Sequence, residues 1–177
     1  MSQPRRVAFL DRDGVLTVPN VVDAKGYAVR RLEDLALYPD AAESVRRLRA
    51  AGFDVVVVTN QPDIANGAVA PAVLAQMHEW LMAQLDIARI HTCPHGQTEA
   101  CACRKPKPGL LLDEAAVAPV DFEASWIVGD RDSDIAAGKA VGCHSVFIAR
   151  GWAAESGEHA DAVVTTLTEA VDAILSA

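Results

Sequence analysis

Positive charge and aromatic side chains are both scarce in this sequence. Lys and Arg number 16 against 24 Asp and Glu, which gives a formal net charge of −8, and aromatic residues make up 5% of the chain. Binding to the phosphate backbone of a nucleic acid relies on clusters of Lys and Arg, so a chain with this charge balance is poorly suited to it. We therefore expect no nucleic-acid partner.

Long hydrophobic runs are also lacking. The first apolar run, Val7 to Leu10, stops at Asp11, and the longest valine run covers only Val55 to Val58. A membrane span needs about 20 apolar residues, and a signal peptide needs a longer apolar stretch than either run offers. We expect no membrane partner and no targeting segment, and therefore a cytoplasmic protein in which the 4 cysteines stay reduced.

Ala, Val and Leu are abundant, and they form short apolar runs that alternate with helical patterns. With 51% hydrophobic residues among 177, we expect one domain spanning residues 1–177. Strands are expected at 7–10, 55–58, 88–92, 125–128, 145–148 and 162–164, and helices at 41–50 after the cap Asp40, 71–85, 110–117, 134–141 and 168–175. Residues 17–38 are expected to form a loop. Alternating strands and helices with short connections predict an α/β fold, a Rossmann-like parallel sheet with helices on both faces.

Two carboxylates, Asp11 and Asp13, follow the first expected strand. Ligands of open parallel sheets bind outside the carboxyl ends of the strands, which is where these residues would lie. One carboxylate there can attack phosphorus and form an acyl phosphate, and a second can protonate the leaving oxygen and then activate water. Gly14 allows the sharp turn that follows. The same residues also suit a plain polar turn in which Asp13 bonds to its own backbone.

Three other segments carry polar residues at expected strand ends or in the loops between them. Thr59 and Asn60 can hold phosphoryl oxygens, although they also suit a turn. Arg104 and Lys105 can neutralise a phosphoryl group, although a solvated run of charges has the same composition. Asp130 follows another strand and offers the hard oxygen ligand that Mg²⁺ prefers. Together with Asp11, these segments predict one phosphate site at one edge of the sheet.

Three cysteines and one histidine lie close together in the chain: Cys93, His95, Cys101 and Cys103. Three thiolates and an imidazole are the ligand set of a structural tetrahedral Zn²⁺ site. Disulfides are the competing interpretation, but reducing conditions and the Cys-x-Cys spacing disfavour them. We predict a small zinc-bound loop that positions Arg104, with Cys143 an ordinary buried thiol outside the site.

These segments resemble the haloacid dehalogenase superfamily of phosphotransferases, from about Val7 to Gly151. The resemblance implies Asp11 as nucleophile, Asp13 as acid/base, phosphoryl contacts from Thr59 and Lys105, and catalytic Mg²⁺ at Asp11, Asp13 and Asp130. Asp134 completes the Gly-Asp-x-x-x-Asp pattern, either as a helix cap, as an acceptor behind the ligands or as a ligand itself.

Within the superfamily, the zinc loop and the stretch Cys-Arg-Lys-Pro-Lys-Pro-Gly at 103–109 resemble a compact branch without a separate cap domain. This resemblance implies a hydrolase for a small phosphorylated metabolite. D-glycero-D-manno-heptose 1,7-bisphosphate, losing its 7-phosphate, and histidinol phosphate are the two substrates that the branch implies.

The loop residues divide between these two substrates. The heptose pattern is resembled by Gly26-Tyr27, the Thr-Asn-Gln at 59–61 with the Ile-Ala-x-Gly at 64–67, and the Lys-Pro-Gly at 107–109. The short zinc loop and the Gly-Asp-Arg-x-x-Asp at 129–134 resemble the histidinol pattern. Asn66 stands where the heptose pattern usually has Arg. We favour the heptose bisphosphate, with histidinol phosphate as the alternative, and a monomeric enzyme in which Arg104 recognises the second phosphate. The expected substrate contacts are Arg12, Gly26, Tyr27, Asn60, Gln61, Arg104 and Arg131.

Overall fold

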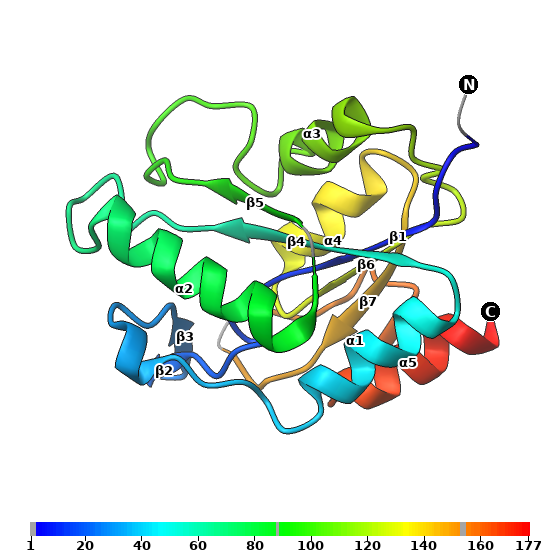
Figure 1. Ribbon diagram of the computed structural model, residues 1–177, viewed down its shortest axis with the longest axis horizontal. Helices are drawn as coiled ribbons and strands as arrows, with labels where there is room; N and C mark the ends of the chain where they lie inside the picture. Colours follow the sequence, from blue (N-terminus) through cyan, green and yellow to red (C-terminus); the bar gives the residue numbers. More distant parts are fainter. Residues whose placement is uncertain (1–2, 88, 153–154) are drawn as a thin grey trace.

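The fold is built on a sheet of parallel strands, shown in Figure 1 by a computed structural model that describes residues 3–87, 89–152 and 155–177. This 6-stranded sheet has the order β5-β4-β1-β6-β7-β8, and each neighbouring pair is parallel. The strands are β1 (Val7–Leu10), β4 (Asp54–Asn60), β5 (Arg89–Cys93), β6 (Trp126–Gly129), β7 (His144–Ile148) and β8 (Ala162–Val164). The predicted α/β class is confirmed.

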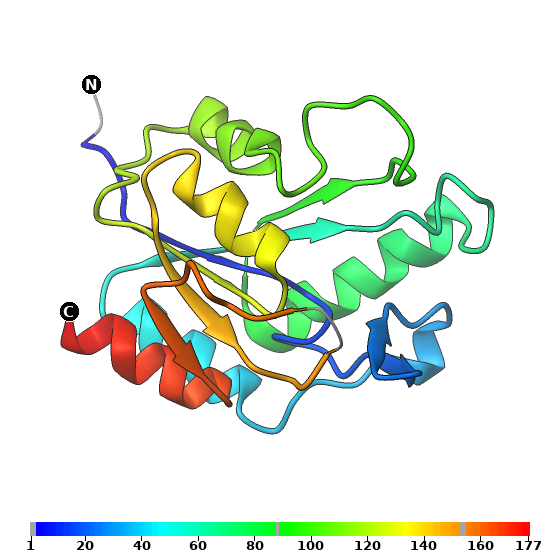
Figure 2. The same ribbon diagram turned by 180° about the vertical axis from the view of Figure 1, so that it is seen from behind.

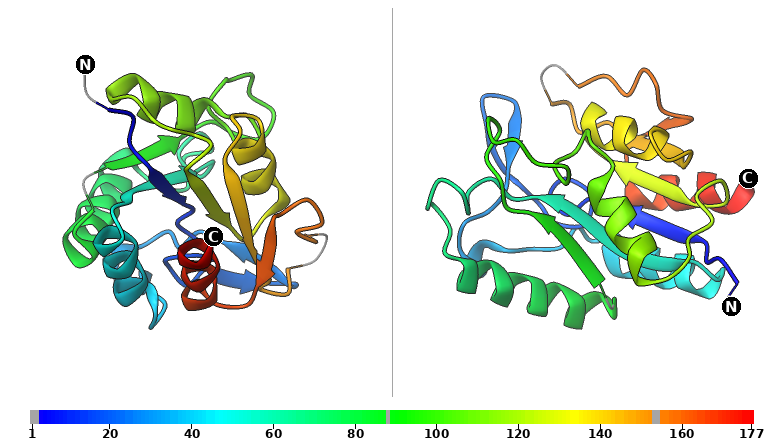
Figure 3. Two further views of the ribbon diagram at one scale, coloured as in Figure 1. Left: turned by 90° about the vertical axis from the view of Figure 1, so that its right-hand side faces the viewer. Right: turned by 90° about the horizontal axis from the view of Figure 1, so that it is seen from above.

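Helices cover both faces of the sheet, as the end-on view in Figure 3 shows. Side chains of α1 (Ala41–Ala50), α2 (Pro71–Leu85) and α5 (Leu167–Ser176) share one core cluster, and those of α3 (Gly109–Val117) and α4 (Asp132–Lys139) share another. The valines of β4 alternate between the two clusters, because successive side chains of a strand point to opposite faces. The valine run is therefore buried on both sides, as expected for a central parallel strand.

The strand order brings the expected site residues to one edge of the sheet. β1 lies between β4 and β6, so the segment after β1 is flanked by the segments that follow those two strands. The chain leaves β1 toward β4 and β5 and later returns to its other side with β6, β7 and β8; β7 and β8 lie toward the viewer in Figure 2. A reversal of this kind in a parallel sheet is the usual position of a ligand site.

A small hairpin lies in the segment that was predicted to be a loop. Residues 17–38 contain β2 (Asn20–Val22), antiparallel to β3 (Lys25–Tyr27), and the 3-10 helix η1 (Leu32–Asp34). The two turn residues, Asp23 and Ala24, have φ angles of 48° and 56°, as a tight hairpin turn requires. The usual sequence for such a turn is Asn-Gly or Asp-Gly, so Asp-Ala provided only a weak signal.

Several element ends differ from prediction. Helix α4 begins at Asp132 instead of Asp134 and ends at Lys139. Strand β5 continues to Cys93, while Ala88, the expected first residue, lies outside the described residues. Asp40 precedes α1, but its carboxylate accepts from the Thr168 backbone N–H of α5 at 3.0 Å instead of capping α1. In the described part of the chain, no helix is long and apolar enough to cross a membrane.

A buried ion network fixes α3 against the sheet. The Glu114 side chain is fully buried and accepts from Arg5 Nη2 at 2.8 Å, Arg89 Nε at 2.9 Å and His91 Nε2 at 2.9 Å. Burial alone would raise the pKa of Glu114, but these three partners outweigh it and lower the pKa. Because α3 begins directly after the segment that carries Lys105, the network anchors one end of that segment.

Glu114→Gln should destabilise the protein at neutral pH. Removing the charge leaves Arg5 and Arg89 without their buried partner. We expect a loss of about 2 to 3 kcal/mol of unfolding free energy. This is less than for an ion pair with both partners buried, because both arginines are partly exposed to solvent. Since the folded pKa of Glu114 is lowered, its contribution is present above the unfolded value of about 4.3 and lost as pH falls through the folded one. Urea unfolding between pH 7 and pH 3 measures this.

The matched control is Glu123→Gln, at an exposed position of the same region. We expect a change of less than about 0.5 kcal/mol there. Equal stability of the two variants at pH 7, or a Glu114→Gln deficit that grows toward acid pH, would contradict the assignment.

Candidate active site

The segment after β1 is packed tightly against the end of β6. The Asp11 backbone N–H donates to the Val128 carbonyl at 3.0 Å, which continues the parallel pairing of the two strands. Gly14 then turns the chain with φ of +90°, and a Cβ at this position would lie 2.0 Å from Asp130 Oδ2. Only glycine fits there, so the Asp-Arg-Asp-Gly turn places Asp11 beside Asp130.

Lys105 is the buried cation of the site. Its Nζ donates to Asp11 Oδ1 at 2.9 Å and to the Val58 carbonyl at 2.7 Å, and it lies 2.6 Å from Asp134 Oδ1. Burial alone would lower the pKa of Lys105, but the carboxylates of Asp11 and Asp134 outweigh it and raise the pKa. Lys105 is therefore held as a charged ammonium between two carboxylates and the end of β4.

Asn60 fixes the backbone that carries Lys105. Its side-chain Nδ2 donates to the Lys105 carbonyl at 3.1 Å, and its Oδ1 accepts from the Lys105 backbone N–H at 3.1 Å. The amide thus imitates a neighbouring strand and joins the end of β4 to the segment before α3. Asn60 also lines the cavity described below, although both ends of its amide are occupied by Lys105.

Three carboxylates form a group that suits a hard divalent cation. Asp11, Asp130 and Asp134 are all buried, and each offers an oxygen within 4.8 Å of the others. Burial, followed by the neighbouring carboxylate of Asp134, raises the pKa of Asp11 to about 6 against the opposing effect of Lys105. Asp130 Oδ1 is buried with no hydrogen-bond partner among the described residues. This donor set fits Mg²⁺, which takes oxygen ligands and would satisfy the unpaired oxygen.

The carboxylate of Asp13 is not among these three grouped side chains, so its expected place in the Mg²⁺ set stays a prediction. Its oxygens accept from Arg12 Nε at 2.9 Å, Gln61 Nε2 at 2.9 Å and Thr17 Oγ1 at 3.2 Å. The side chain still lines the cavity, so these three donors hold it beside Asp11 without turning it toward Asp130. Asp134, whose role the sequence left open, is the third member of the group, and its Oδ2 also accepts from the Arg131 N–H at 3.1 Å.

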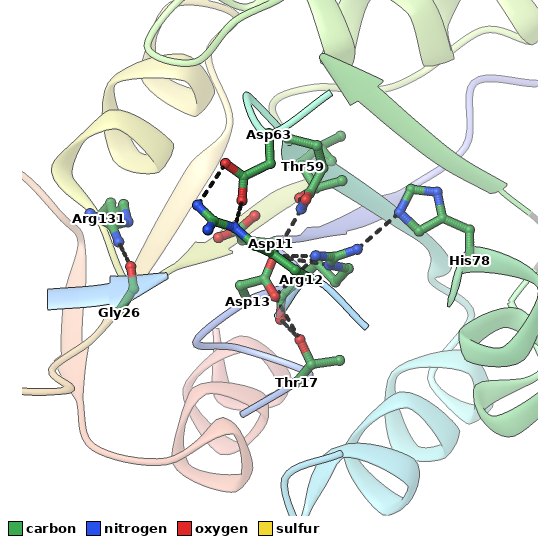
Figure 4. A network of polar contacts seen from close by, with 12 residues as sticks. Asp11, Arg12, Asp13, Thr17, Gly26, Thr59, Asp63, His78 and Arg131 are labelled. Atoms are coloured by element: carbon green, nitrogen blue, oxygen red, sulfur yellow. Dashed lines mark hydrogen bonds and ion pairs between the residues drawn. The ribbon is translucent and has the colours of Figure 1, made fainter. Parts of the chain in front are cut away.

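Arg12 and Gln61, which were expected to contact substrate, do not line the cavity among the described residues. Arg12 is fully buried, and Figure 4 shows its guanidinium between Asp13 and His78. Its Nη1 donates to His78 Nε2 at 3.3 Å. Burial and the charge of Arg12 lower the pKa of His78 to about 4, so the imidazole is neutral at physiological pH. Gln61 bridges Asp13 to Thr59, whose Oγ1 accepts at 2.8 Å.

A cavity of about 650 Å³ opens above the carboxylates. Thr59, Arg104 and Arg131 line it as predicted, together with Gly26 and Tyr27 of the hairpin. Arg131 reaches across and donates from Nη2 to the Gly26 carbonyl, as Figure 4 shows. The lining residues not predicted from the sequence are Lys25, Ala28, Pro62, Asp63, Gln97, Pro106, Ser133 and Glu155. Only Lys25 and Ser133 carried a usable signal, since they adjoin Gly26 and the Asp-rich stretch.

The four predicted zinc ligands converge. Cys93 Sγ lies 3.8 Å from Cys101 Sγ and 3.5 Å from His95 Nδ1, and His95 Nδ1 lies 3.2 Å from Cys103 Sγ. Sulfur ligands about 2.3 Å from a tetrahedral Zn²⁺ lie roughly 3.8 Å apart, so the spacing fits a tetrahedral metal. Cys143 is a free, buried thiol in the core cluster beneath α3 and α4, as predicted.

Many known proteins are similar to this chain in sequence or in structure. A family model described as HAD-hydrolase-like matches residues 102–170. The D-glycero-beta-D-manno-heptose-1,7-bisphosphate 7-phosphatase of Pseudomonas aeruginosa is 38% identical over 152 residues, 83% of each chain. The enzyme of the same description from Escherichia coli K12 is 33% identical over 94% of this chain and 92% of its own. The chain belongs to this phosphatase family.

A solved structure of a phosphatase has a closely similar fold. D,D-heptose 1.7-bisphosphate phosphatase from B. bronchiseptica, complexed with magnesium and phosphate, has a TM-score of 0.83 and 30% identity, with 97% of this chain and 98% of that chain covered. The resemblance to haloacid dehalogenase-like phosphatases drawn from the sequence is therefore confirmed, and the described residues contain no separate cap domain, as expected.

Asn60→Ala should loosen the Lys105 segment. The variant leaves the Lys105 N–H and carbonyl without partners, and we expect a loss of about 1 to 2 kcal/mol of unfolding free energy and a fall in kcat, because the ammonium is no longer held in place. Urea unfolding and steady-state kinetics measure the two effects. Asn20→Ala, at an exposed position of β2, is the control and should leave stability within about 0.5 kcal/mol of wild type. Wild-type stability of Asn60→Ala would rule out the clamp.

Proposed function

We propose that the protein removes the 7-phosphate of D-glycero-D-manno-heptose 1,7-bisphosphate through an aspartyl-phosphate on Asp11. The observation that carries this proposal is the buried Asp11–Lys105 pair at the floor of a cavity whose walls hold three further cations, Lys25, Arg104 and Arg131. A substrate with two phosphates needs positive charge at both ends. The relatives from Pseudomonas aeruginosa and Escherichia coli K12, both described as phosphatases of this substrate, match 83% and 94% of this chain.

In the first step, an Asp11 carboxylate oxygen attacks phosphorus, and the bond between phosphorus and the sugar oxygen breaks. Asp13 donates a proton to that departing oxygen, which leaves as an alcohol. Lys105 and the Thr59 hydroxyl, both lining the cavity, bind the phosphoryl oxygens and offset the charge that moves onto them.

In the second step, water attacks the phosphorus of the aspartyl-phosphate and gives its proton to Asp13. The bond between phosphorus and Asp11 breaks, which restores the carboxylate and releases inorganic phosphate. Arg12, Thr17 and Gln61 hold Asp13 for both transfers, so Arg12 acts by positioning and not by contact with substrate. Asp11, Asp130 and Asp134 would hold Mg²⁺, which when bound neutralises part of the charge of the carboxylates and the phosphoryl group.

The second phosphate is bound by cations of the cavity wall. Arg104 follows the last cysteine of the zinc loop, Lys25 comes from the hairpin, and Arg131 immediately precedes α4. These side chains come from three different segments, so they can bind an anion between them. Asn66 is exposed, donates to the cavity-lining Asp63 at 3.0 Å and does not itself line the cavity among the described residues. An Arg at that position would add a cation near the cavity, and Lys25 is a lining cation that this chain offers instead.

We further propose that the chain works as one domain and as a monomer. One six-stranded sheet, with helices on both faces, carries the catalytic and metal-binding segments of the described residues, which supports a single domain. Size-exclusion chromatography with light scattering tests the monomer.

Substrate comparison tests the proposal. We expect kcat/KM for the heptose 1,7-bisphosphate, in its better anomer, to exceed that for histidinol phosphate by about 100-fold or more, because only the bisphosphate uses the second set of cations. Asp11→Asn should lower turnover by about 10⁴-fold, since the amide cannot attack phosphorus. Acid quenching with substrate labelled in the 7-phosphate should leave label on wild-type protein and none on the variant.

The control is Asp113→Asn, at an exposed position of α3, which should keep wild-type kcat/KM. Higher kcat/KM for histidinol phosphate would overturn the substrate, and near-wild-type turnover by Asp11→Asn would overturn the mechanism.

We also propose that Zn²⁺ occupies the Cys93, His95, Cys101 and Cys103 group as a structural ion. The four protein ligands complete a tetrahedron, so no position remains for substrate. Arg104 follows directly, and its Nη1 donates to the His95 carbonyl at 3.3 Å. The zinc loop thus holds a wall of the cavity from a distance.

Cys103→Ala should therefore lose the zinc and raise KM for the bisphosphate more than it changes kcat. The expected rise in KM is about tenfold, the lower end of the range for loss of a positioning contact. Metal analysis should find about one zinc per chain in wild type and far less in the variant. Cys143→Ala is the matched control, because Cys143 is buried outside the group, and it should retain zinc and wild-type KM. Zinc-free wild-type protein with full thermal stability would refute the role.

A further inference from the structure

Trp152 touches the carboxylate group from outside the cavity. Its indole Nε1–H donates to Asp130 Oδ2, while Asp130 Oδ1 is buried and has no hydrogen-bond partner among the described residues. Asp130 is only 1% exposed, so few groups can reach it. One oxygen of the proposed metal ligand is therefore anchored and the other remains available.

The ring of the same tryptophan packs against the hairpin. A Cβ on Gly26 would lie 3.0 Å from Trp152 Cζ2 and 3.2 Å from Trp152 Cε2, so the glycine and the indole are already in close contact. Gly26 is the middle residue of β3, and its neighbours Lys25 and Tyr27 both line the cavity. The position of the indole therefore limits how closely β3, which forms part of the cavity wall, can approach the rest of the site.

Arg131 holds the hairpin at the same point. Its guanidinium donates to the Gly26 carbonyl. Gly26 therefore has two neighbours that hold it: Arg131, just before α4, bonds to its carbonyl, and the Trp152 ring packs against its Cα. Arg131 follows Asp130 in the chain, which places both contacts beside the carboxylate group. The hairpin makes only a 2-stranded sheet of its own, and these contacts join it to the main sheet's edge.

We propose that Trp152 is a positioning residue that orients Asp130 for Mg²⁺ with its N–H and seats the β2–β3 hairpin with its ring. The inference rests on the proposed function for the identity of the metal ligands. A charged acceptor strengthens the indole bond, and partners that orient a metal ligand commonly change metal affinity by 10- to 100-fold when removed. One rigid side chain makes both contacts, so it links the proposed metal site to the wall of the cavity.

Trp152→Phe separates the two roles, because it removes the N–H and keeps an aromatic ring. We expect the Mg²⁺ concentration for half-maximal activity to rise about tenfold, with kcat at saturating Mg²⁺ within about threefold of wild type. The rise in melting temperature that Mg²⁺ produces should need correspondingly more Mg²⁺, and this readout requires no substrate. Trp80→Phe, the same substitution in α2, is the matched control and should leave both Mg²⁺ midpoints unchanged.

Gly26→Ala tests the ring contact alone. The added methyl pushes against the indole and against Pro19, so the wall of the cavity shifts by a few tenths of an ångström while the indole N–H remains. We expect a higher KM for the bisphosphate with the Mg²⁺ midpoint of thermal stabilisation less affected than in Trp152→Phe. Equal Mg²⁺ midpoints in Trp152→Phe and Trp80→Phe would overturn the inference, and so would a larger shift of the Mg²⁺ midpoint in Gly26→Ala than in Trp152→Phe.

Two measurements keep the inference separate from folding and from the choice of substrate. If Trp152→Phe does not fold, the Trp80→Phe protein, which retains Trp152, is measured instead. Its tryptophan emission must change when Mg²⁺ is added, and constant emission contradicts the inference. If the heptose bisphosphate is not turned over, the same Mg²⁺ midpoints can be read with p-nitrophenyl phosphate and by thermal stabilisation. A failure of the proposed substrate therefore leaves the Trp152 result intact.

Discussion

The ion pair between Lys105 and Asp11 is the interaction on which the site depends. Three buried carboxylates around it would repel one another, and one ammonium among them leaves a net charge of 1 − 3 = −2. That is the charge with all three carboxylates ionised, and a divalent cation would balance it; without one, burial and the neighbouring carboxylates raise the pKa of Asp130 well above its usual value. The carboxylates of Asp11 and Asp134 keep the poorly exposed Lys105 charged. Separating these charges from water is expensive, and only the surrounding hydrogen bonds and a bound cation make the arrangement favourable.

The scaffold serves this charge cluster by bringing distant segments to one place. Lys105 and Asp11 are separated by 94 positions in the sequence, yet the central position of β1 puts the ends of β4 and β6 on either side of Asp11. Asn60 then ties the Lys105 backbone to β4 as though it were another strand. The precision of the site comes from the sheet, while the loops and the hairpin supply the walls.

Sequence reasoning located the charge cluster because its members follow recognisable strands. Val7 to Leu10 and Val55 to Val58 are apolar runs of strand length, so the polar residues after them had to meet at one edge. The directions of the side chains could not be predicted from the sequence. Arg12 points inward to Asp13, and the Asp13 carboxylate is not grouped with Asp11, Asp130 and Asp134, because neighbours in sequence can face opposite sides of a turn.

The other failures have different causes. The hairpin was missed because Asp23 and Ala24 adopt left-handed backbone angles without the usual glycine. Contacts of Trp152 with Asp130 and Gly26 join segments far apart in the chain, and no local pattern announces them. The roles assigned to the individual site residues remain predictions, whereas the fold and the family are established.

The register of the edge strand has a consequence for the Cys/His group. Cys93 is the last residue of β5 and is paired with Asn60 of β4, and the Asn60 amide also bonds to the backbone of Lys105. The other three members of the group, His95, Cys101 and Cys103, lie between these two points of the chain. Both ends of the loop that carries them are therefore fixed at one residue of β4, which shortens the span that the loop must close.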